Sequence, residues 1–372
     1  MNERDYWLGF SVFSGIGPFK FKKILKEFGT AKKAWEGANV KIIKVLSEKL
    51  GAKFIDFRNK FSIENYLKSL KKENVWFLTL EDKHYPVLLS KIKKPPFVLY
   101  GKGLEFKSWE KADLERAIGI VGARRTTHYG REVTRLFTNQ LVGSGFTIVS
   151  GLAIGVDATS HKSALDNGGK TVAVLGCGVD CCNPTENVNL YKRIIESGST
   201  IVSELPLSHP PSKGSFPQRN RIIAGLSQAV LVTEGAEDSG SLITANYAFE
   251  LGRKVFAVPG PITSSLSKGP YKLLKKGARL VTKIEDILEE LKFEIRNSKS
   301  ETNSKSQITK RKTENKEEEK ILKILENESL HFDEIVRRSQ LDSSKIGSLL
   351  SIMEIKGMVK SSGNLYSINS EF

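Results

Sequence analysis

The sequence predicts an α/β protein whose central part is a doubly wound parallel sheet. Short runs rich in β-branched residues begin near positions 118, 146, 171, 200, 229, 254 and 279, and a glycine turn and a helical pattern follow each run. Strands that alternate with helices at this spacing are typical of a parallel sheet. Runs such as TVAVLG and AVLVTEG are almost continuously apolar, as expected for strands that helices cover on both faces.

Length and composition are those of a globular protein of two or three domains. The chain has 372 residues, of which 39% are hydrophobic and 27% charged. No apolar run approaches the roughly 20 residues that span a bilayer, and the N-terminus lacks a signal-peptide pattern. The three cysteines, Cys177, Cys181 and Cys182, fall in one predicted loop. We therefore expect a cytoplasmic protein without membrane insertion.

The charge of the chain predicts a polyanionic partner. The formal net charge is +16, and residues 1–110 hold 22 Lys and Arg against 12 Asp and Glu. Charge alone does not separate nucleic acid from an anionic membrane surface, and a solvated lysine-rich surface is a further interpretation.

The segment before the sheet is predicted to be a helical domain, residues 1–70. A Gly-x-Gly-Pro turn at residues 15–18 joins two short helical patterns, 6–13 and 19–28. Such a turn resembles those of helix-hairpin-helix and sterile-alpha-motif-like modules, in which backbone N–H groups meet DNA phosphates. A plain helical connection explains it equally well. Residues 66–110 form a bridge with a helix to Lys72, a strand at 76–79 and prolines at 86, 95 and 96, which confine it to turns and sheet-edge positions. This bridge is expected to dock on the sheet that follows.

The sheet domain is predicted to end at residue 291, and two further segments follow it. Residues 292–316 are polar and rich in Ser, Thr, Asn and Lys, which predicts a flexible linker. Residues 317–372 show three helices and a hairpin, which is the order of a winged helix. The third helix is mostly apolar, so a structural or protein-contact role fits it as well as DNA reading does.

The stretch from Ala117 to Asp157 is expected to hold the first part of a binding site. It reads as a strand (118–121), a turn with Gly122, Arg124 and Arg125, a helix (129–142) and a second strand (146–149). Ligands of parallel sheets bind beyond the carboxyl ends of the strands, where helix N-termini present N–H groups to anions. The two arginines are therefore expected to lie where a phosphate would bind.

A second candidate segment, predicted to be a loop from Lys213 to Gly225, follows the strand at 200–203 and so lies on the same sheet edge. Single-stranded nucleic acid needs cations that follow its phosphates and a ring on which a base stacks. This segment supplies both, in Lys213, Phe216, Arg219, Asn220 and Arg221. Alternatively, the two arginines bind carboxylates such as Glu204 or Glu234, and the ring belongs to the core.

A third candidate is the serine-capped helix start at Ser239, Gly240 and Ser241, which is suited to an anion. The neighbouring Glu237 and Asp238 would repel phosphate, so only the serines and the glycine between them are predicted to contribute.

Nucleotide and metal motifs do not fit. A dinucleotide fingerprint needs small residues after Gly122, where Arg124 stands. The sequence Gly-Gly-Lys-Thr at 168–171 leads into a strand rather than out of one, so a helix-to-strand turn is predicted instead of a phosphate-binding loop. The cysteines lack a neighbouring histidine or a second cysteine pair, which disfavours zinc. No cofactor or metal is expected.

Catalytic motifs do not fit either. Asp157 and His161, four residues apart on a predicted helix, invite an acid–base interpretation. A structural role is favoured, in which the carboxylate accepts backbone N–H bonds at the helix start and orients the imidazole. We therefore predict no catalytic residue.

Taken in order, seven motifs closely resemble the DprA/Smf family of DNA-processing proteins, and they extend densely over residues 76–291. The motifs are IGIVGARRTTHYG, IVSGLAIGVDATSHKSAL, AVLGCGVD, SELP, FPQRNRIIAGLS, SGSLITA and VFAVPGP. The helical domain before them and the winged helix after them fit the longer members of that family.

The resemblance implies an extended Rossmann fold that binds single-stranded DNA without a nucleotide cofactor or catalysis. It also implies a homodimer that loads the RecA recombinase onto incoming strands during natural transformation and recombination, and that displaces or accommodates single-strand binding protein. In the family, the surfaces that bind the second subunit and RecA lie in the last third of the Rossmann domain, near residues 255–290 of this chain. The resemblance assigns no single residue to them.

Motif matching carries two contacts over to this chain. The G-S-R turn of the family falls on Gly122, Ala123 and Arg124, which makes Arg124 the arginine that grips a phosphate. The K-x-x-F-P-x-R-N-R motif places Lys213 on a phosphate and Phe216 on a base.

The chain departs from the family pattern at three places. Ala123 replaces a serine, residues 181–183 (Cys-Cys-Asn) replace an apolar and tyrosine run, and Ser160 replaces an alanine.

Two other functions are weighed against DNA binding. Nucleotide phosphoribohydrolases of the lysine-decarboxylase-like group have similar sheets and a P-G-G-x-G-T-x-x-E loop, but residues 237–241 lack the paired glycines and the glutamate at that spacing. The second alternative, a winged-helix transcription regulator that binds duplex DNA, is supported by residues 317–369 alone.

Overall fold

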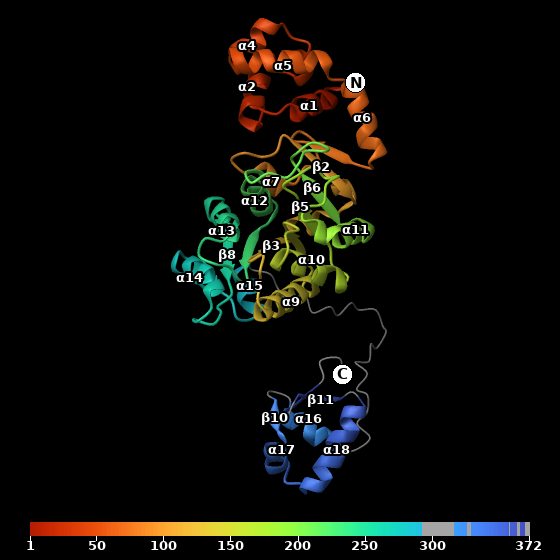
Figure 1. The fold of residues 1–372 in the computed structure, drawn as a ribbon, viewed down its shortest axis with the longest axis vertical. Coiled ribbons are helices and arrows are strands. Elements are labelled where there is room, and N and C mark those ends of the chain that lie inside the picture. Colours follow the sequence, from red (N-terminus) through yellow and green to blue (C-terminus); the bar gives the residue numbers. More distant parts are fainter. Residues whose placement is uncertain (292–315, 326–328, 357, 363–364, 369–372) are drawn as a thin grey trace. The chain divides into compact units, whose positions relative to one another are not determined.

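The computed structural model describes residues 1–291, 316–325, 329–356, 358–362 and 365–368. The chain divides into two compact units, Met1–Arg296 and Asn297–Phe372 (Figure 1). The predicted linker lies outside the described residues except for Lys316, which begins a helix. The predicted boundary between residues 70 and 71 lies inside the first unit and stays a prediction.

The first unit contains a nine-stranded sheet, counted over the described residues, in the order β1-β2-β6-β5-β4-β3-β7-β8-β9. The pairs among β3 to β9 are parallel, while β2 pairs antiparallel with β1 and β6. The predicted parallel sheet with a docked edge segment is confirmed. The strands are β1 (Trp76–Thr79), β2 (Val98–Gly103), β3 (Ala117–Val121), β4 (Thr147–Ser150), β5 (Thr171–Val174), β6 (Thr200–Ser203), β7 (Ala229–Val232), β8 (Lys254–Ala257) and β9 (Arg279–Leu280).

Helices cover both faces of this sheet, and successive side chains of each strand point to opposite faces. In β4, Ile148 packs in one cluster with α9 and α15, whereas Val149 packs on the opposite side with α12 and α13. Because both faces are covered, the strands are apolar on both sides. The helices of this part are α7 (Val87–Ser90), α8 (Lys111–Glu115), α9 (His128–Gly143), α10 (Val156–Asp166), α11 (Val188–Glu196), α12 (Ser215–Leu226), α13 (Gly240–Glu250), α14 (Lys268–Lys275) and α15 (Glu285–Glu290). Three short 3-10 helices are Phe106–Ser108, Thr185–Asn187 and Ser265–Ser267.

The direction in which the chain adds strands to the sheet reverses at β3: β4, β5 and β6 follow on one side of it, and β7, β8 and β9 on the other. Gly119 in β3 pairs with Val149 of β4 on one side and with Val230 of β7 on the other. The chain therefore leaves neighbouring strands toward opposite faces, which opens a crevice beyond their carboxyl ends.

Six helices precede the sheet and share a core with its edge. Phe21 stacks on Phe97 with ring centroids 4.2 Å apart, and the hydroxyl of the buried Tyr100 in β2 lies 2.5 Å from Ser11 Oγ. These helices are α1 (Glu3–Val12), α2 (Pro18–Phe28), α3 (Ala31–Trp35), α4 (Asn39–Leu46), α5 (Glu48–Lys60) and α6 (Ile63–Lys72). Pro18 begins α2, where a missing N–H costs no hydrogen bond. DNA contact at the preceding glycine turn stays a prediction.

The second unit is a winged helix, as predicted. Among its described residues it has a three-stranded antiparallel sheet in the order β10-β12-β11. Ile346, Leu350 and Met353 of its third helix are buried, so the apolar pattern of that helix builds the core. The elements are α16 (Lys316–Leu325), β10 (Leu330–His331), α17 (Phe332–Ser339), α18 (Ser343–Ile355), β11 (Val359–Ser362) and β12 (Leu365–Ile368).

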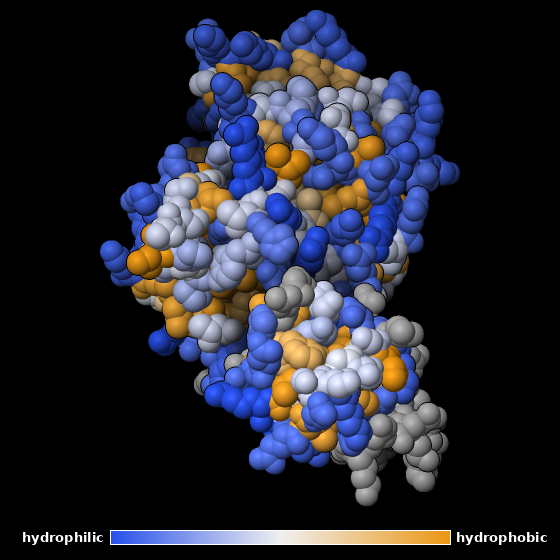
Figure 2. Space-filling model, turned by 60° about the horizontal axis from the view of Figure 1, so that its bottom comes forward, coloured by the Kyte–Doolittle hydropathy of each residue, from blue (hydrophilic) through white to orange (hydrophobic). Residues whose placement is uncertain are grey.

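Hydrophilic side chains cover most of the face drawn in Figure 2, and apolar residues form small separated groups on it. Within the described ranges, no helix combines the length and the apolar character that crossing a bilayer requires.

Candidate nucleic-acid interface

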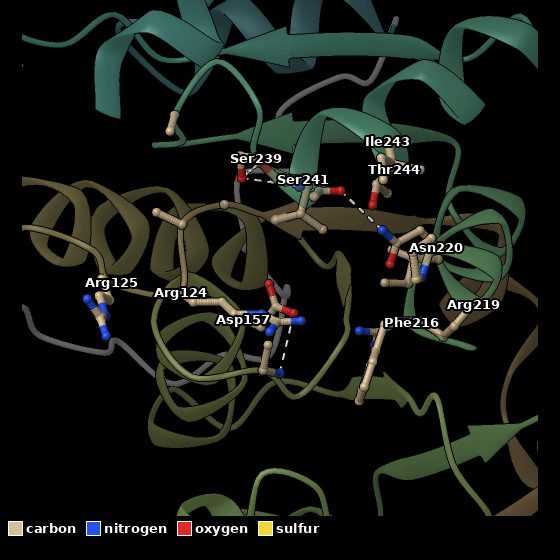
Figure 3. Close-up of a pocket in the computed structure, with 18 of the residues that line it drawn as sticks. Arg124, Arg125, Asp157, Phe216, Arg219, Asn220, Ser239, Ser241, Ile243 and Thr244 are labelled. Carbon is tan, nitrogen blue, oxygen red and sulfur yellow. Dashed lines mark hydrogen bonds between the residues drawn. The ribbon is translucent and has the colours of Figure 1, made fainter. Parts of the chain in front are cut away.

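A cavity of about 530 Å³ lies beyond the carboxyl end of β3, beside the first turns of α12 and α13 (Figure 3). Ten of the eleven residues predicted from the sequence line it, and Arg221 is the exception. The ten are Gly122, Arg124, Arg125, Lys213, Phe216, Arg219, Asn220, Ser239, Gly240 and Ser241. The sheet thus brings together three segments that are far apart in the sequence.

The turn after β3 is held between two neighbours. The Ala123 N–H donates to the Glu234 carbonyl at 2.7 Å, and the Ala123 carbonyl accepts from the Val156 N–H at 3.1 Å. A Cβ on Gly122 would lie 2.6 Å from the Glu234 carbonyl oxygen, so this position has no room for a side chain. The exposed Arg124 follows directly, and Figure 3 shows it reaching into the cavity while Arg125 points away.

The side chain of Glu234 fixes the start of α9. This carboxylate is buried and accepts hydrogen bonds from Thr126 Oγ1 at 2.7 Å, Thr127 N at 2.9 Å and Thr127 Oγ1 at 2.6 Å. The Thr127 hydroxyl also caps the helix by accepting from the Gly130 N–H. The sequence suggested Glu234 as a partner of the arginines at 219 and 221, and this interpretation was wrong. The sequence signal that could have indicated its role is a carboxylate directly after an apolar strand.

The segment from Lys213 is a helix start rather than the predicted loop. Ser215 begins α12, and its N–H donates to Ser212 Oγ while the Ser212 N–H donates to Ser215 Oγ, both at 3.1 Å. Pro217 lies in the first turn, where its missing N–H has no helical partner to lose. Glycine and proline therefore mark the beginning of a helix here, and the exposed Lys213 lies just before it.

Phe216 and Arg124 lie close together at the cavity. The guanidinium carbon of Arg124 lies 5.6 Å from the centroid of the phenyl ring, within range of a cation–π interaction. The ring is half-buried and packs on Gly176, where a Cβ would come within 2.9 Å of it. Phe216 is therefore only partly buried, and it lines the cavity beside a cation.

Arg219 is buried beneath the cavity. Its Nη1 donates to the Gly151 carbonyl at 2.6 Å and also to the Val174 carbonyl, which joins α12 to the ends of β4 and β5. Burial lowers the pKa of Arg219, and the charge of Asp157 counteracts this shift. These contacts disfavour the predicted phosphate contact and indicate a positioning role.

Arg221 and Asn220 also bond to protein groups. Arg221 Nη2 lies 2.5 Å from Glu204 Oε2, and both side chains are largely shielded from solvent. The sequence left open an ion pair between Arg221 and Glu204, and the structure contains it. Asn220 Nδ2 donates to the Gly240 carbonyl at 3.1 Å (dashed in Figure 3), which ties α12 to α13.

The third wall is the N-terminus of α13. Ser239 Oγ accepts from the Ser241 N–H at 3.3 Å and lies 2.8 Å from Ser241 Oγ. Glu237, which was expected to repel phosphate, lies 3.3 Å from Lys272 Nζ, although both side chains are largely exposed.

Asp157 and His161 do not form the expected pair. Asp157 accepts the Ala153 N–H at 3.4 Å, and burial raises the pKa of its carboxyl. The Nδ1 atom of His161 lies 2.6 Å from Thr171 Oγ1, so a strand threonine orients the imidazole instead of the carboxylate. Burial lowers the pKa of His161 to about 3, which keeps it neutral at physiological pH.

The cysteines lie in the segment between β5 and α11, outside the lining of the cavity. Cys177 is buried, its thiol donates to the Cys181 carbonyl at 3.2 Å, and burial raises its pKa to about 12. In the part of the chain that the structure describes, no group of three His, Cys, Asp or Glu side chains is arranged to hold a metal ion.

Comparison with known proteins assigns both units. The family model of DNA recombination-mediator protein A matches residues 76–292, and the model of the DprA winged helix domain matches residues 309–363.

Curated relatives match beyond the sheet domain. Protein Smf of Synechocystis is 40% identical over 292 residues, which cover 78% of this chain and 73% of that protein. Protein Smf of Escherichia coli is 43% identical over 65% of this chain and 63% of its own length. The DNA processing protein DprA of Bacillus subtilis is 41% identical over 60% of this chain and 74% of its own.

Solved structures also resemble the chain. The X-ray structure of DprA from Streptococcus pneumoniae aligns with a TM-score of 0.68 and 34% identity, covering 79% of this chain and 99% of that one. DprA from Helicobacter pylori, described for its single-stranded DNA binding mode, aligns with a TM-score of 0.50 and 31% identity over 59% of this chain and 97% of its own.

Proposed function

The chain belongs to the DNA recombination-mediator protein A family, also called DprA/Smf, and from this premise we propose that it binds single-stranded DNA at the cavity beyond β3. The observation that carries the proposal is the pairing of Arg124 with Phe216. The guanidinium carbon lies 5.6 Å from the centroid of a half-buried ring, and the exposed Lys213 lines the same cavity.

The chemistry of this cavity suits an unpaired strand. Arg124 and Lys213 offer charges to phosphates, and the exposed part of the Phe216 ring offers a stacking surface to a base. Duplex DNA keeps its bases stacked on one another, so the ring would have no partner there. The solved Helicobacter pylori relative, described as a single-stranded DNA binder, supports the same assignment.

The remaining lining residues are proposed to shape the site. Gly122 and Gly240 let backbone approach the strand, and Ser239 and Ser241 present the N-terminus of α13 to a phosphate. Arg219, Asn220 and Arg221 act as positioning residues, since their side chains already bond to protein groups. Arg125, which points away from the cavity, is proposed to contact the strand outside it.

We propose that binding is independent of DNA sequence and proceeds without catalysis. Charges and a ring recognise features that every nucleotide shares. Of the acid–base pair that the sequence suggested, Asp157 lines the cavity, whereas His161 is fully buried and does not line it, so the two do not act there as a pair.

From family membership we further propose that the chain acts as a homodimer that loads RecA onto the strand in natural transformation. Accommodation of single-strand binding protein belongs to the same proposal.

Fluorescence anisotropy with a labelled oligo-thymidine at about 50 mM and about 200 mM salt tests the DNA site. Arg124→Ala and Lys213→Ala should each weaken binding and lower the salt dependence of log K by about 0.7, the contribution of one phosphate contact to single strands. Lys107→Ala, which removes one charge outside the cavity lining, serves as the control. Unchanged affinity in both cavity variants would refute the site.

The same assay with duplex competitor distinguishes the alternatives. Single strands should compete more strongly than a duplex of the same sequence, whereas a winged-helix regulator would prefer a specific duplex. Release of free base from nucleoside monophosphates would instead favour a phosphoribohydrolase.

A further inference from the structure

A second hollow, of about 880 Å³, lies beside the first and is lined by α9, α10 and α11 together with the segments that lead into them. Arg124 and Arg125 line both hollows, so the two adjoin at the turn after β3. The proposed function leaves this second hollow without a role.

The lining of the second hollow is strongly basic. It contains six cations but only two carboxylates, Asp166 and Glu186. Arg193 Nη2 lies 2.6 Å from Asp166 Oδ1, which neutralises one of those carboxylates. The six cations are Arg124, Arg125, Arg131, Arg135, Lys162 and Arg193.

Several of these cations have no carboxylate partner. Over the residues that the structure describes, the side chains of Arg125, Arg135 and Lys162 form no ion pair, and all three are exposed. Arg131 donates to the Thr126 carbonyl at 2.8 Å, which orients its guanidinium without cancelling the charge. Clustered like charges repel one another, and a bound polyanion would relieve that repulsion.

The cations follow a line that starts at the first cavity. Arg131, Arg135 and Asn139 are spaced by four residues and so share one face of α9. From residue 131 to residue 139 the helix rises about 12 Å, so these side chains are spread along α9 rather than gathered at one point. Lys162 adds a charge from α10, which packs against α9. At the far end Asn139 Oδ1 accepts hydrogen bonds from Ser163 Oγ at 2.5 Å and Asn167 Nδ2 at 2.7 Å.

The lining contains no aromatic residue, in contrast to the first cavity with Phe216. It therefore offers charge and hydrogen bonds but no stacking surface, which suits a sugar-phosphate backbone whose bases face solvent.

We propose that this α9–α11 groove binds the phosphates of the nucleotides that flank those held at Phe216, so that one strand runs from the first cavity past Arg124 and Arg125 along α9. The inference rests on the proposed function, because it extends the same strand. It gives Arg125, which points out of the first cavity, a contact in the second.

The test compares full-length proteins on two oligo-thymidines, one of about six nucleotides and one of about twenty, by anisotropy at two salt concentrations. The double variant Arg135→Gln/Lys162→Gln removes two exposed charges that do not line the first cavity. It should bind the long strand about tenfold more weakly and lower the salt dependence of log K by about 1.4, with no change on the short strand.

Lys107→Gln/Lys111→Gln removes the same charge outside both hollows and should leave both affinities unchanged. Unaltered binding of the long strand by the groove variant, while Arg124→Ala still weakens the short one, would overturn this inference alone. Equal losses on both strands would overturn it as well, because the groove would then not be a separate extension. Failure of the wild type to bind the short strand would instead contradict the proposed function.

Discussion

Arg124 and Phe216 lie side by side, yet they should contribute to binding in different ways. At the proposed site the charge of the guanidinium would displace counterions from DNA, whereas the ring would contribute stacking that salt affects little. Their contributions are therefore separable by salt dependence.

Phe216→Leu should weaken oligo-thymidine binding by about 1–3 kcal/mol, the usual value of one stacked base, while the salt dependence stays that of the wild type. Phe216→Tyr keeps an aromatic face and should bind almost normally. Anisotropy titrations at two salt concentrations measure both variants. A fall in salt dependence in Phe216→Leu would show that the ring acts mainly by holding Arg124.

His161 makes the stability of the first unit sensitive to acid. Its pKa in the folded chain is about 3 because burial disfavours the charged imidazolium, while the unfolded chain binds a proton near pH 6.5. Between these values the unfolded state holds more protons, so stability is complete above about pH 6.5 and falls as the pH falls.

From pH 7 to pH 5 this residue alone should lower the free energy of unfolding by about 2 kcal/mol. His161→Gln removes the titration and should show a correspondingly smaller loss, whatever its stability at pH 7. Urea unfolding at both pH values measures the difference. Identical pH dependence in the two proteins would contradict a depressed pKa.

At the scale of secondary-structure elements, the site depends on how closely the turn after β3 and the start of α10 approach. Gly155 caps α10 with φ +84° and ψ −129°, a conformation that side chains rarely adopt. A Cβ there would collide with the carbonyl oxygens of Ala123 and Arg124. Glycine at this position therefore lets the arginine turn lie against the helix.

Gly155→Ala should destabilise the chain by several kcal/mol and weaken DNA binding, since the clash displaces the carbonyl of Arg124. Gly168→Ala is the matched control, because Gly168 also has a positive φ (+67°) but no neighbouring atom within 4 Å of the place that a Cβ would occupy. It should cost about 1–2 kcal/mol and leave binding intact. Thermal unfolding and anisotropy compare the two, and equal losses would show that backbone conformation alone is responsible.

At the scale of the whole molecule, the proposed DNA contacts all lie in the first unit. Every residue that lines the two hollows falls within Met1–Arg296. The second unit has its own core, and charged side chains on its helices pair with each other, as Lys345 does with Glu317 at 2.5 Å.

A fragment of residues 1–296 should therefore fold by itself and bind the short oligo-thymidine within about twofold of the full chain, with the same loss on Arg124→Ala. Circular dichroism establishes folding, and anisotropy measures affinity. Loss of binding by a folded fragment would show that the winged helix takes part in holding the strand.

The sequence by itself determined the strand positions, the parallel sheet and the sheet edge at which the candidate residues gather. Those features follow from local patterns, since apolar runs, glycine turns and helix signals act over a few residues, and parallel strands bring their carboxyl ends to one edge. Ten of the eleven site residues share a cavity for that reason.

Only the tertiary structure decided what each polar side chain contacts. Arg219 reaches the carbonyls of two strands, Arg221 reaches Glu204, and His161 reaches Thr171. Each contact joins different elements, and the local sequence reports neither the partner nor the burial. The exposed Arg124 and the buried Arg219 therefore look alike in the sequence, and packing alone separates a solvent-exposed charge from one that joins α12 to the sheet.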